Sequence, residues 1–329
     1  MVDFSRRKFS HLATAFLFVV GTFPFAVPAS AAGDFVVTLL GTASPAPRPG
    51  RMGPSTLVVV NGQRLLFDAG RGATIRLWQM RIPIGSLDAT FLTHFHSDHI
   101  NGLPDVWLTG WLGTPYGSRL TPFRLVGPIG TKTLMEHLEK AYQADIDIRH
   151  KDEGEPLEGI RTDVTEFKTS SVVWSKDGVT VTAVENDHGD LIKPSFGYKV
   201  TFDGRAVVIS GDTRPSPAIV EAARGTDLLI HEVAAAAEPL LAIPFFRAVI
   251  NHHTTPVDAG RIFAEVRPKL AVYTHIVLLS NKDNPEPSID DVVQGTRKTY
   301  DGPLVVGTDL MSFDIGKAGV SIVNYNVPQ

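Results

Sequence analysis

The run His94–His99, of sequence HFHSDH, constrains this chain more than any other feature. It places three imidazoles and a carboxylate directly after an apolar, strand-like stretch. Imidazole nitrogen and carboxylate oxygen are ligands that suit Zn²⁺ and similar divalent cations. Because alternate residues of an extended segment point the same way, His94 and His96 can converge on one ion, and a following turn would offer Asp98 and His99 to a second. Burying these groups without a cation would be costly, so the run predicts a metal site rather than a solvated loop.

Further blocks each place one ligand-type residue after an apolar run: Phe67-Asp68-Ala69-Gly70, Asn186-Asp187-His188, Ser210-Gly211-Asp212-Thr213 and Tyr273-Thr274-His275. Together with the His94–His99 run, and in this order, they resemble the metallo-β-lactamase-fold hydrolases. The resemblance covers nearly the whole chain after residue 31. It implies an α/β (α+β) class and a single domain, a four-layer αββα sandwich in which two mixed sheets lie between helices.

The resemblance also implies a ligand set for two metal ions, most simply Zn²⁺. The first ion would be bound by His94, His96 and His188, the second by Asp98, His99 and His275, with Asp212 and a hydroxide bridging the two. Paired cations lower the pKa of bound water from near 16 to about 7, which makes hydroxide available as a nucleophile that Asp98 would help to orient. Asp68 would accept a hydrogen bond from a ligand imidazole and fix its tautomer. The chain has no cysteine, which excludes variants with a thiolate in the second site.

The first residues predict a twin-arginine export signal that occupies residues 1–31. Arg6-Arg7 precedes the apolar stretch Leu12–Val27, and the small residues Ala29-Ser30-Ala31 suit cleavage after Ala31. A membrane anchor is the competing interpretation, but the stretch is short for a span of about 20 residues and contains a proline. We therefore expect the twin-arginine machinery to deliver the mature domain, residues 32–329, to the periplasm.

The mature domain is acidic and has no disulfides. Removing residues 1–31 lowers the formal net charge from −4 to −6, and the chain contains no cysteine. An acidic surface has no general attraction for polyanions. This charge argues against a nucleic-acid partner.

Short β-rich runs alternate with helical patterns along the mature chain. The patterns predict strands at 35–40, 55–60, 64–67, 89–92, 172–174, 179–186, 195–202, 205–210, 227–231 and 270–274, and helices at 73–80, 131–144, 217–223 and 256–266. The turn Asp203-Gly204 predicts a hairpin between two of these strands.

Several blocks narrow the resemblance to ribonuclease Z and its relatives, which include zinc arylsulfatases and phosphodiesterases. They are Gly41–Pro45, Pro194–Tyr198, Gly211–Pro215, His231–Val233 and His253–Thr255. The resemblance implies that His253 is a general acid oriented by Glu232, since a histidine pKa lies near the operating pH. The sequence leaves open whether His252 or His253 donates the proton. His231 is interpreted as a buried strand-end residue.

One departure from that branch weakens the RNA interpretation. Ribonuclease Z usually carries a long basic arm between the third histidine block and the bridging aspartate, whereas His188 and Asp212 are separated here by one hairpin. A small ester substrate is therefore expected, and no nucleic acid. Trp107, Trp111 and the segment 234–250 would either wall a pocket or pack in the core. Arg48, Arg51 and Arg214 could bind an anionic ester group, but for any one of them solvation at the surface is the favoured interpretation.

These observations predict an exported two-metal hydrolase that cleaves a sulfate ester or a phosphodiester, similar to arylsulfatases and phosphodiesterases. The alternatives are lactone or β-lactam opening by the same hydroxide, a ribonuclease Z-type tRNA 3′ endonuclease, against which the missing arm argues, and a periplasmic metal-binding module without turnover. The substrate, the native metal and the oligomeric state, a homo-oligomer included, stay open. So does the question whether residues 101–125 and 234–250 form a lid.

Overall fold

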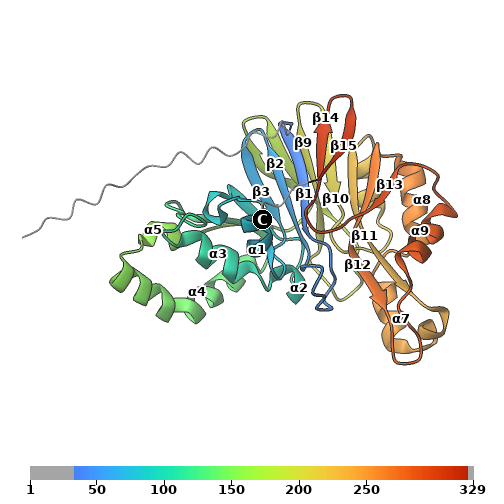
Figure 1. The fold of residues 1–329 in the computed structure, drawn as a ribbon, viewed down its shortest axis with the longest axis horizontal. Helices are drawn as coiled ribbons and strands as arrows, with labels where there is room; N and C mark the ends of the chain where they lie inside the picture. The colour runs from blue at the N-terminus through green and yellow to red at the C-terminus, as the bar shows by residue number, and fades with distance from the viewer. Residues whose placement is uncertain (1–32, 325–329) are drawn as a thin grey trace, which may run out of the picture. The chain divides into compact units, whose positions relative to one another are not determined.

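Two stacked β-sheets form the centre of the structure, a computed structural model that describes residues 33–324 (Figure 1). The described residues belong to one compact unit. The predicted export signal, residues 1–31, lies outside the described residues and stays a prediction. Between residues 33 and 324, no helix combines the length and the apolar character that crossing a membrane requires.

The first sheet has eight strands in the order β15-β14-β1-β2-β3-β4-β5-β6. Their bounds are β1 Phe35–Gly41, β2 Ser55–Val60, β3 Gln63–Phe67, β4 Ala89–Phe91, β5 Phe123–Pro128, β6 Thr162–Phe167, β14 Met311–Gly316 and β15 Gly319–Asn324. The run β3-β4-β5-β6 is parallel. Because parallel strands end at the same edge, the residues that follow β3 and β4 meet there.

The second sheet has seven strands in the order β13-β12-β11-β10-β9-β8-β7. Their bounds are β7 Ser171–Lys176, β8 Val179–Glu185, β9 Phe196–Phe202, β10 Arg205–Ile209, β11 Leu228–Ala236, β12 Leu270–Leu279 and β13 Leu304–Val306. Strands β10 to β13 are parallel, and β9 and β10 form the predicted hairpin. Its turn residues Asp203 and Gly204 both have positive φ, 48° and 74°, as a two-residue turn of this kind requires.

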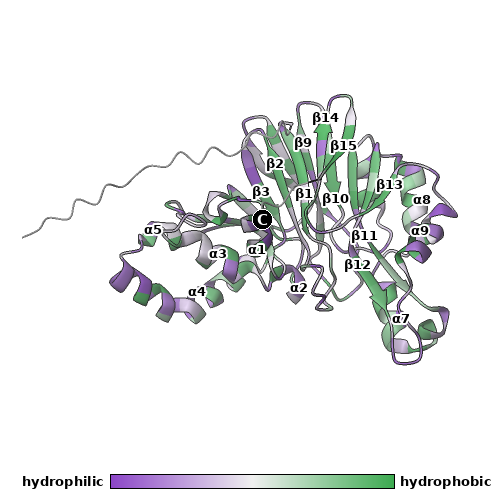
Figure 2. Ribbon diagram, in the orientation of Figure 1, coloured by the Kyte–Doolittle hydropathy of each residue, from purple (hydrophilic) through white to green (hydrophobic). Residues whose placement is uncertain are grey.

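Helices cover the outer face of each sheet. Their bounds are α1 Ala73–Gln79, α2 Ser97–Ile100, α3 Leu103–Trp111, α4 Thr131–Ile148, α5 Leu157–Ile160, α6 Pro217–Ala223, α7 Pro244–Asn251, α8 Pro256–Val266 and α9 Ile289–Arg297. One apolar core lies between the sheets, a second packs under α1, α3 and α4, and a third under α8 and α9. Figure 2 shows the strands mostly green, whereas α4 and α9 carry purple, polar positions. This layering confirms the predicted four-layer sandwich.

The predicted elements are present, and the structure differs from the prediction at strand ends and in elements that the sequence patterns missed. Strand β11 continues to Ala236 and β12 to Leu279, beyond the ends expected at His231 and Thr274. The extensions pair with one another after a one-residue register shift, so hydrogen bonding between them carries both strands past the point where the sequence pattern weakens. Strands β5, β6, β13, β14 and β15 and helices α5 and α9 were not predicted.

Replacing Phe91 by alanine is expected to destabilise the fold by about 3–5 kcal/mol, because a large buried side chain would leave a cavity. Phe91 is fully buried and stacks on Phe67, with ring centroids 4.8 Å apart. Denaturant-induced unfolding measures the effect. Val172, which is 60% exposed on β7, provides the control, and Val172→Ala should change the free energy of unfolding by less than about 0.5 kcal/mol. A loss below about 1 kcal/mol for Phe91→Ala would mean that the core closes around the gap.

Candidate metal centre

The ligand-type side chains predicted from the sequence gather at one edge of the two sheets, where parallel strands end. His94, His96, Asp98 and His99 follow β4, and Asp98 and His99 lie in the short helix α2. His188 follows β8, Asp212 follows β10, and His275 lies within β12. The structure therefore brings together seven residues from separate parts of the chain.

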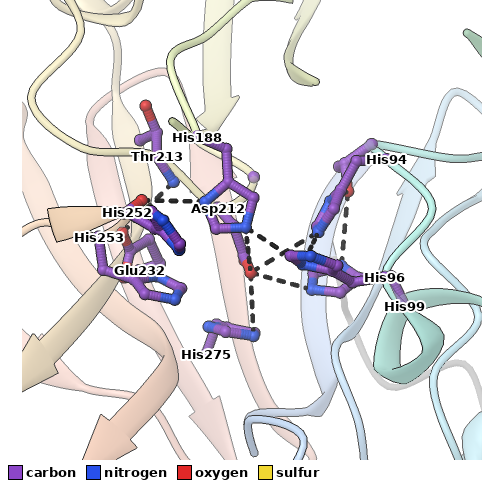
Figure 3. Close-up of polar contacts among 12 residues, drawn as sticks. His94, His96, His99, His188, Asp212, Thr213, Glu232, His252, His253 and His275 are labelled. Atoms are coloured by element: carbon purple, nitrogen blue, oxygen red, sulfur yellow. Dashed lines mark hydrogen bonds and ion pairs between the residues drawn. The ribbon is translucent and has the colours of Figure 1, made fainter. Parts of the chain in front are cut away.

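Asp212 lies between the imidazoles, and dashed contacts from several of them meet at its carboxylate (Figure 3). Its Oδ2 is 3.2 Å from Nε2 of His275, 3.3 Å from Nε2 of His99, 3.7 Å from Nε2 of His188 and 3.9 Å from Nε2 of His94. Asp98 Oδ2 is 3.2 Å from His275 Nε2. A carboxylate in this central position suits a bridge between two cations.

The donor atoms fall into two groups, each with its atoms within 4.8 Å of one another: His94, His96, His188 with Asp212, and Asp98, His99 with His275. A third combination of the same kind joins Asp212 and His275 to His253. His96 is the exposed member of the first group, whereas the members of the second group are all buried. The ligand set is therefore open to solvent on the His96 side.

The cluster fits divalent cations better than it fits an empty polar core. His99 Nε2 and Asp212 Oδ1 are buried and have no hydrogen-bond partner among the described residues. Such an unsatisfied buried group costs about 1–3 kcal/mol. His96 Nδ1 is also only 2.9 Å from His94 Nε2 and 3.2 Å from His188 Nε2, so these nitrogens face a shared point. Cations bound to the two ligand groups would give these atoms the partners that they lack.

Burial and charge set the protonation of the ligands. Burial lowers the pKa of His94 well below its usual value and that of His188 to about 4, which keeps both imidazoles neutral and ready to bind metal. Burial would also lower the pKa of His99, but Asp212 and Asp68 outweigh it and raise that pKa well above 6.5. Burial alone would raise the pKa of Asp212, yet His275 and His99 hold it well below the usual range.

In three of the proposed ligands, the ring nitrogen that faces away from the centre, Nδ1, contacts a polar group of the protein. Asp68 Oδ2 accepts from His99 Nδ1 at 2.7 Å, in the role expected of it, and His188 Nδ1 donates to the backbone carbonyl of His252 at 2.9 Å. His94 Nδ1 is 2.9 Å from the hydroxyl of Thr93, which also contacts Asp68. These contacts fix the tautomer and direct Nε2 toward the centre. Thr93 was missed from the sequence, although its place between a strand and the first ligand was a usable signal.

His253 lies beside the ligands and is paired with Glu232. His253 Nδ1 is 3.2 Å from Glu232 Oε2, and its ring stacks on that of His275 with centroids 5.7 Å apart. The other carboxylate oxygen of Glu232 accepts from the backbone amides of Thr213 and Thr254 at 3.3 and 2.8 Å. Burial lowers the pKa of His253, but Glu232 outweighs it and raises that pKa to about 9. Without metal, Glu232 therefore favours the imidazolium form of His253, whereas burial lowers the pKa of His252.

Other residues singled out from the sequence have structural roles. Trp107 and Trp111 are buried and donate to the carbonyls of Ile160 and Pro156, so they pack in the core and do not wall a pocket. His231 is fully buried at the point where β11 passes the site, as interpreted from the sequence.

The three arginines considered as anion-binding groups are all engaged within the protein. Arg48 pairs with Glu286, and Arg214 pairs with Asp187 and Asp190. Arg51 donates to the Thr42 hydroxyl and to the carbonyl of Gly307. None of the three, as the described residues place them, presents a free guanidinium to a ligand.

Comparisons with known proteins agree with this geometry. Residues 63–276 match the model of the β-lactamase superfamily domain. A ribonuclease Z of Mycobacterium bovis is 35% identical over 282 residues, which cover 85% of this chain and 98% of the relative. A ribonuclease Z of Mycobacterium marinum is 37% identical over 246 residues, which cover 73% of this chain and 86% of the relative.

Solved structures show the same fold at lower identity. The metallo-β-lactamase fold protein YhfI of Bacillus subtilis superposes with a TM-score of 0.64 at 18% identity and covers 84% of this chain and 98% of its own. The short form of human tRNase Z has a TM-score of 0.63 at 21% identity and covers 89% of this chain and 100% of its own. Together with the ligand geometry, these matches show that the chain is a metallo-β-lactamase-fold hydrolase and belongs to the β-lactamase superfamily, in the branch of the ribonuclease Z proteins.

Proposed function

We propose that this chain is a metal-dependent phosphodiesterase that cleaves RNA, as a ribonuclease Z-type endonuclease acting at the 3′ side of tRNA precursors. The observation that carries the proposal is its similarity, 35% over 282 residues, to a protein named ribonuclease Z. The ligand cluster and the adjacent His253–Glu232 pair supply groups that such a reaction uses.

The sequence-based preference for a small sulfate ester or phosphodiester as the substrate was wrong, and so was the expectation of no nucleic acid. Relatives named ribonuclease Z, at 35 and 37% identity, overturn both. The absence of the arm was a poor guide to the substrate. The alignment of 282 residues covers 98% of one relative named ribonuclease Z, so that relative has no room for a long arm that this chain lacks. Net charge was a poor guide too, since a sum over the chain does not describe the surface around one site.

The proposed metal complement is two Zn²⁺ ions on the two ligand groups described above, with Asp212 shared between them. Bound there, the metals would supply a water of lowered pKa and neutralise charge that develops on the phosphate. The protein's own part is to orient the imidazoles through Asp68, Thr93 and the His252 carbonyl, and to present the His253 proton at Nε2 while Nδ1 faces Glu232. That proton is placed to protonate the oxygen that leaves.

Purified protein loaded with zinc tests the substrate. A 3′-extended tRNA transcript is expected to be cut at one position, releasing the trailer. An unstructured RNA of equal length and bis(p-nitrophenyl) phosphate serve as comparison substrates. Hydrolysis of the small diester without any cleavage of the transcript would leave the phosphodiesterase chemistry standing and overturn the RNA substrate.

The pH profile is expected to lose activity on the alkaline side. A general acid acts in its protonated form, so activity is full below the pKa of His253 and falls as pH rises through it. That pKa is about 9 without metal, and nearby cations would lower it, which places the midpoint at or below about 9. Glu232→Gln removes the charge that raises this pKa and should move the alkaline limb to lower pH. An unmoved limb in Glu232→Gln would assign the titration to another group.

Export is proposed separately and is supported by Arg6-Arg7, the apolar stretch Leu12–Val27 and Ala29-Ser30-Ala31. Cell fractionation should find the chain in the periplasm, with a mature N-terminus at or next to Ala32. Replacing both arginines by lysine should retain it inside the cell. This experiment needs no substrate, so its result is independent of the RNA assay.

A further inference from the structure

Strand β12 carries one extra residue at His275. Thr274 pairs with Glu232 and Ile276 with Val233, so His275 has no partner on β11. Its φ is +41°, in the left-handed region that a residue with a side chain seldom adopts. This bulge turns the imidazole toward Asp98 and Asp212, each 3.2 Å from Nε2. Such a conformation persists only where the surroundings hold it.

The backbone on both sides of His275 is held by segments outside β11. Two residues before it, the carbonyl of Tyr273 accepts from the amide of Gly307 at 2.8 Å. One residue after it, the amide of Ile276 donates to the carbonyl of Thr42 at 3.1 Å. Thr42 follows β1, and Gly307 follows β13. Two separate segments therefore fix the bulge from either end.

Asp309 ties these segments together. Its Oδ1 accepts from the Thr42 amide at 3.0 Å and from the Thr42 hydroxyl at 2.8 Å, while its Oδ2 accepts from the Met52 amide at 2.7 Å. Arg76 donates to Oδ2 through Nε and one terminal nitrogen at 3.2 and 3.0 Å. The Asp309 side chain is 5% exposed and that of Arg76 is 14% exposed, so the pair is largely shielded from water.

Arg51 connects Thr42 and Gly307, the two residues whose backbone holds the strand on either side of His275. Its guanidinium donates to the Thr42 hydroxyl at 2.8 Å and to the carbonyl of Gly307 at 3.0 Å. Asp309, Thr42 and Arg51 thus form one hydrogen-bonded network beside the His275 bulge, and within residues 33–324 no hydrogen bond or ion pair joins these three side chains to the imidazole. Removing the Asp309 charge would leave shielded donors unpaired and loosen the Thr42 segment first.

We propose that Asp309 is a positioning residue that acts through Thr42 to hold the His275 bulge, and so sets the affinity of the cation site formed by Asp98, His99 and His275. The first group of ligands takes its orientation from Thr93 and the His252 carbonyl, so it should respond little. The inference rests on the proposed metal centre and does not depend on RNA as the substrate.

Zinc binding to the purified full chain tests this proposal. Asp309→Asn keeps the shape but removes the charge, and Thr42→Val removes one hydroxyl. Asp301→Asn is the control, because Asp301 is 87% exposed and lies 3.8 Å from Arg267 at the surface. Competition with a chromophoric chelator gives the stoichiometry and the dissociation constant of each zinc, and thermal unfolding of the metal-free proteins reports the fold.

Asp309→Asn is expected to weaken one of the two zinc equivalents by about 10- to 100-fold, the effect usual for an outer partner of a metal ligand, and to leave the other within about threefold. Thr42→Val should also weaken one zinc equivalent, by a smaller factor, and leave the other unchanged. If Asp309→Asn does not fold, Thr42→Val alone tests the proposal. Asp301→Asn should match the parent. Two unchanged equivalents, or two equivalents weakened equally, would overturn the proposal. Because no substrate is used, failure of the RNA assay would leave this result untouched.

Discussion

Replacing Asp212 by alanine is expected to remove bound metal and to lower turnover of any phosphodiester by about 10³-fold or more. Metal ions supply several kcal/mol of charge stabilisation to such reactions, and each 1.4 kcal/mol corresponds to a factor of ten in rate. Asp212 contacts imidazoles of both ligand groups and is 2% exposed, so its loss affects both sites together. Elemental analysis after dialysis, combined with the rate on bis(p-nitrophenyl) phosphate, measures the two effects.

Asp301→Ala is the matched control, since it removes an equal charge from an 87% exposed position. It should retain the parent's metal content and rate. Circular dichroism separates loss of metal from loss of fold. If Asp212→Ala bound two equivalents as tightly as the parent, the bridging role would have to be abandoned.

Replacing His253 by alanine is expected to lower kcat by about 10² to 10⁴-fold while the metal content stays unchanged, because the variant loses a proton donor and not a ligand. The pair with Glu232 and the raised pKa both favour the protonated imidazole. The loss should shrink for substrates whose leaving group needs no proton, such as a nitrophenolate. Rates on bis(p-nitrophenyl) phosphate and on an RNA diester, measured with the same preparation, provide this comparison.

His252→Ala separates the two adjacent histidines. The backbone carbonyl of His252, which accepts from His188 Nδ1, is present in any residue, so this variant should keep metal and lose at most a few-fold in rate. A large loss in His252→Ala together with a small one in His253→Ala would reverse the assignment of the proton donor. A loss of zinc in His253→Ala would instead make His253 a ligand, as the grouping of Asp212, His253 and His275 allows.

The ligand motifs could be found from the sequence because each comes after an apolar run in the chain. His94, His188 and Asp212 all come within a few residues of a strand end, and parallel strands bring their carboxyl ends to one edge. The hydrophobic pattern of the sequence and the strand topology therefore place these residues at the same edge of the sheets. The same logic predicted the β9–β10 hairpin from Asp203-Gly204.

The parts that escaped prediction depend on contacts between distant residues. Asp309 lies 267 positions from Thr42, and the sequence around either residue does not indicate the hydrogen bond between them. The φ of His275 results from pairing between β11 and β12, which a single sequence does not display. Substrate choice escaped for a different reason, since one fold supports many chemistries and composition does not identify the molecule that the site accepts.

The proposed ligands divide between the two sheets, four of them following β4 and three belonging to the second sheet. A cation bound by ligands from both sheets would link the two sheets, and the chain has no cysteine that could form a disulfide between them. By mass action, free metal at a thousand times its dissociation constant would add about 4 kcal/mol to the stability of the native state. Chelation should therefore lower the melting temperature as well as abolish turnover, and metal supply would govern how long the protein survives, not only how fast it works.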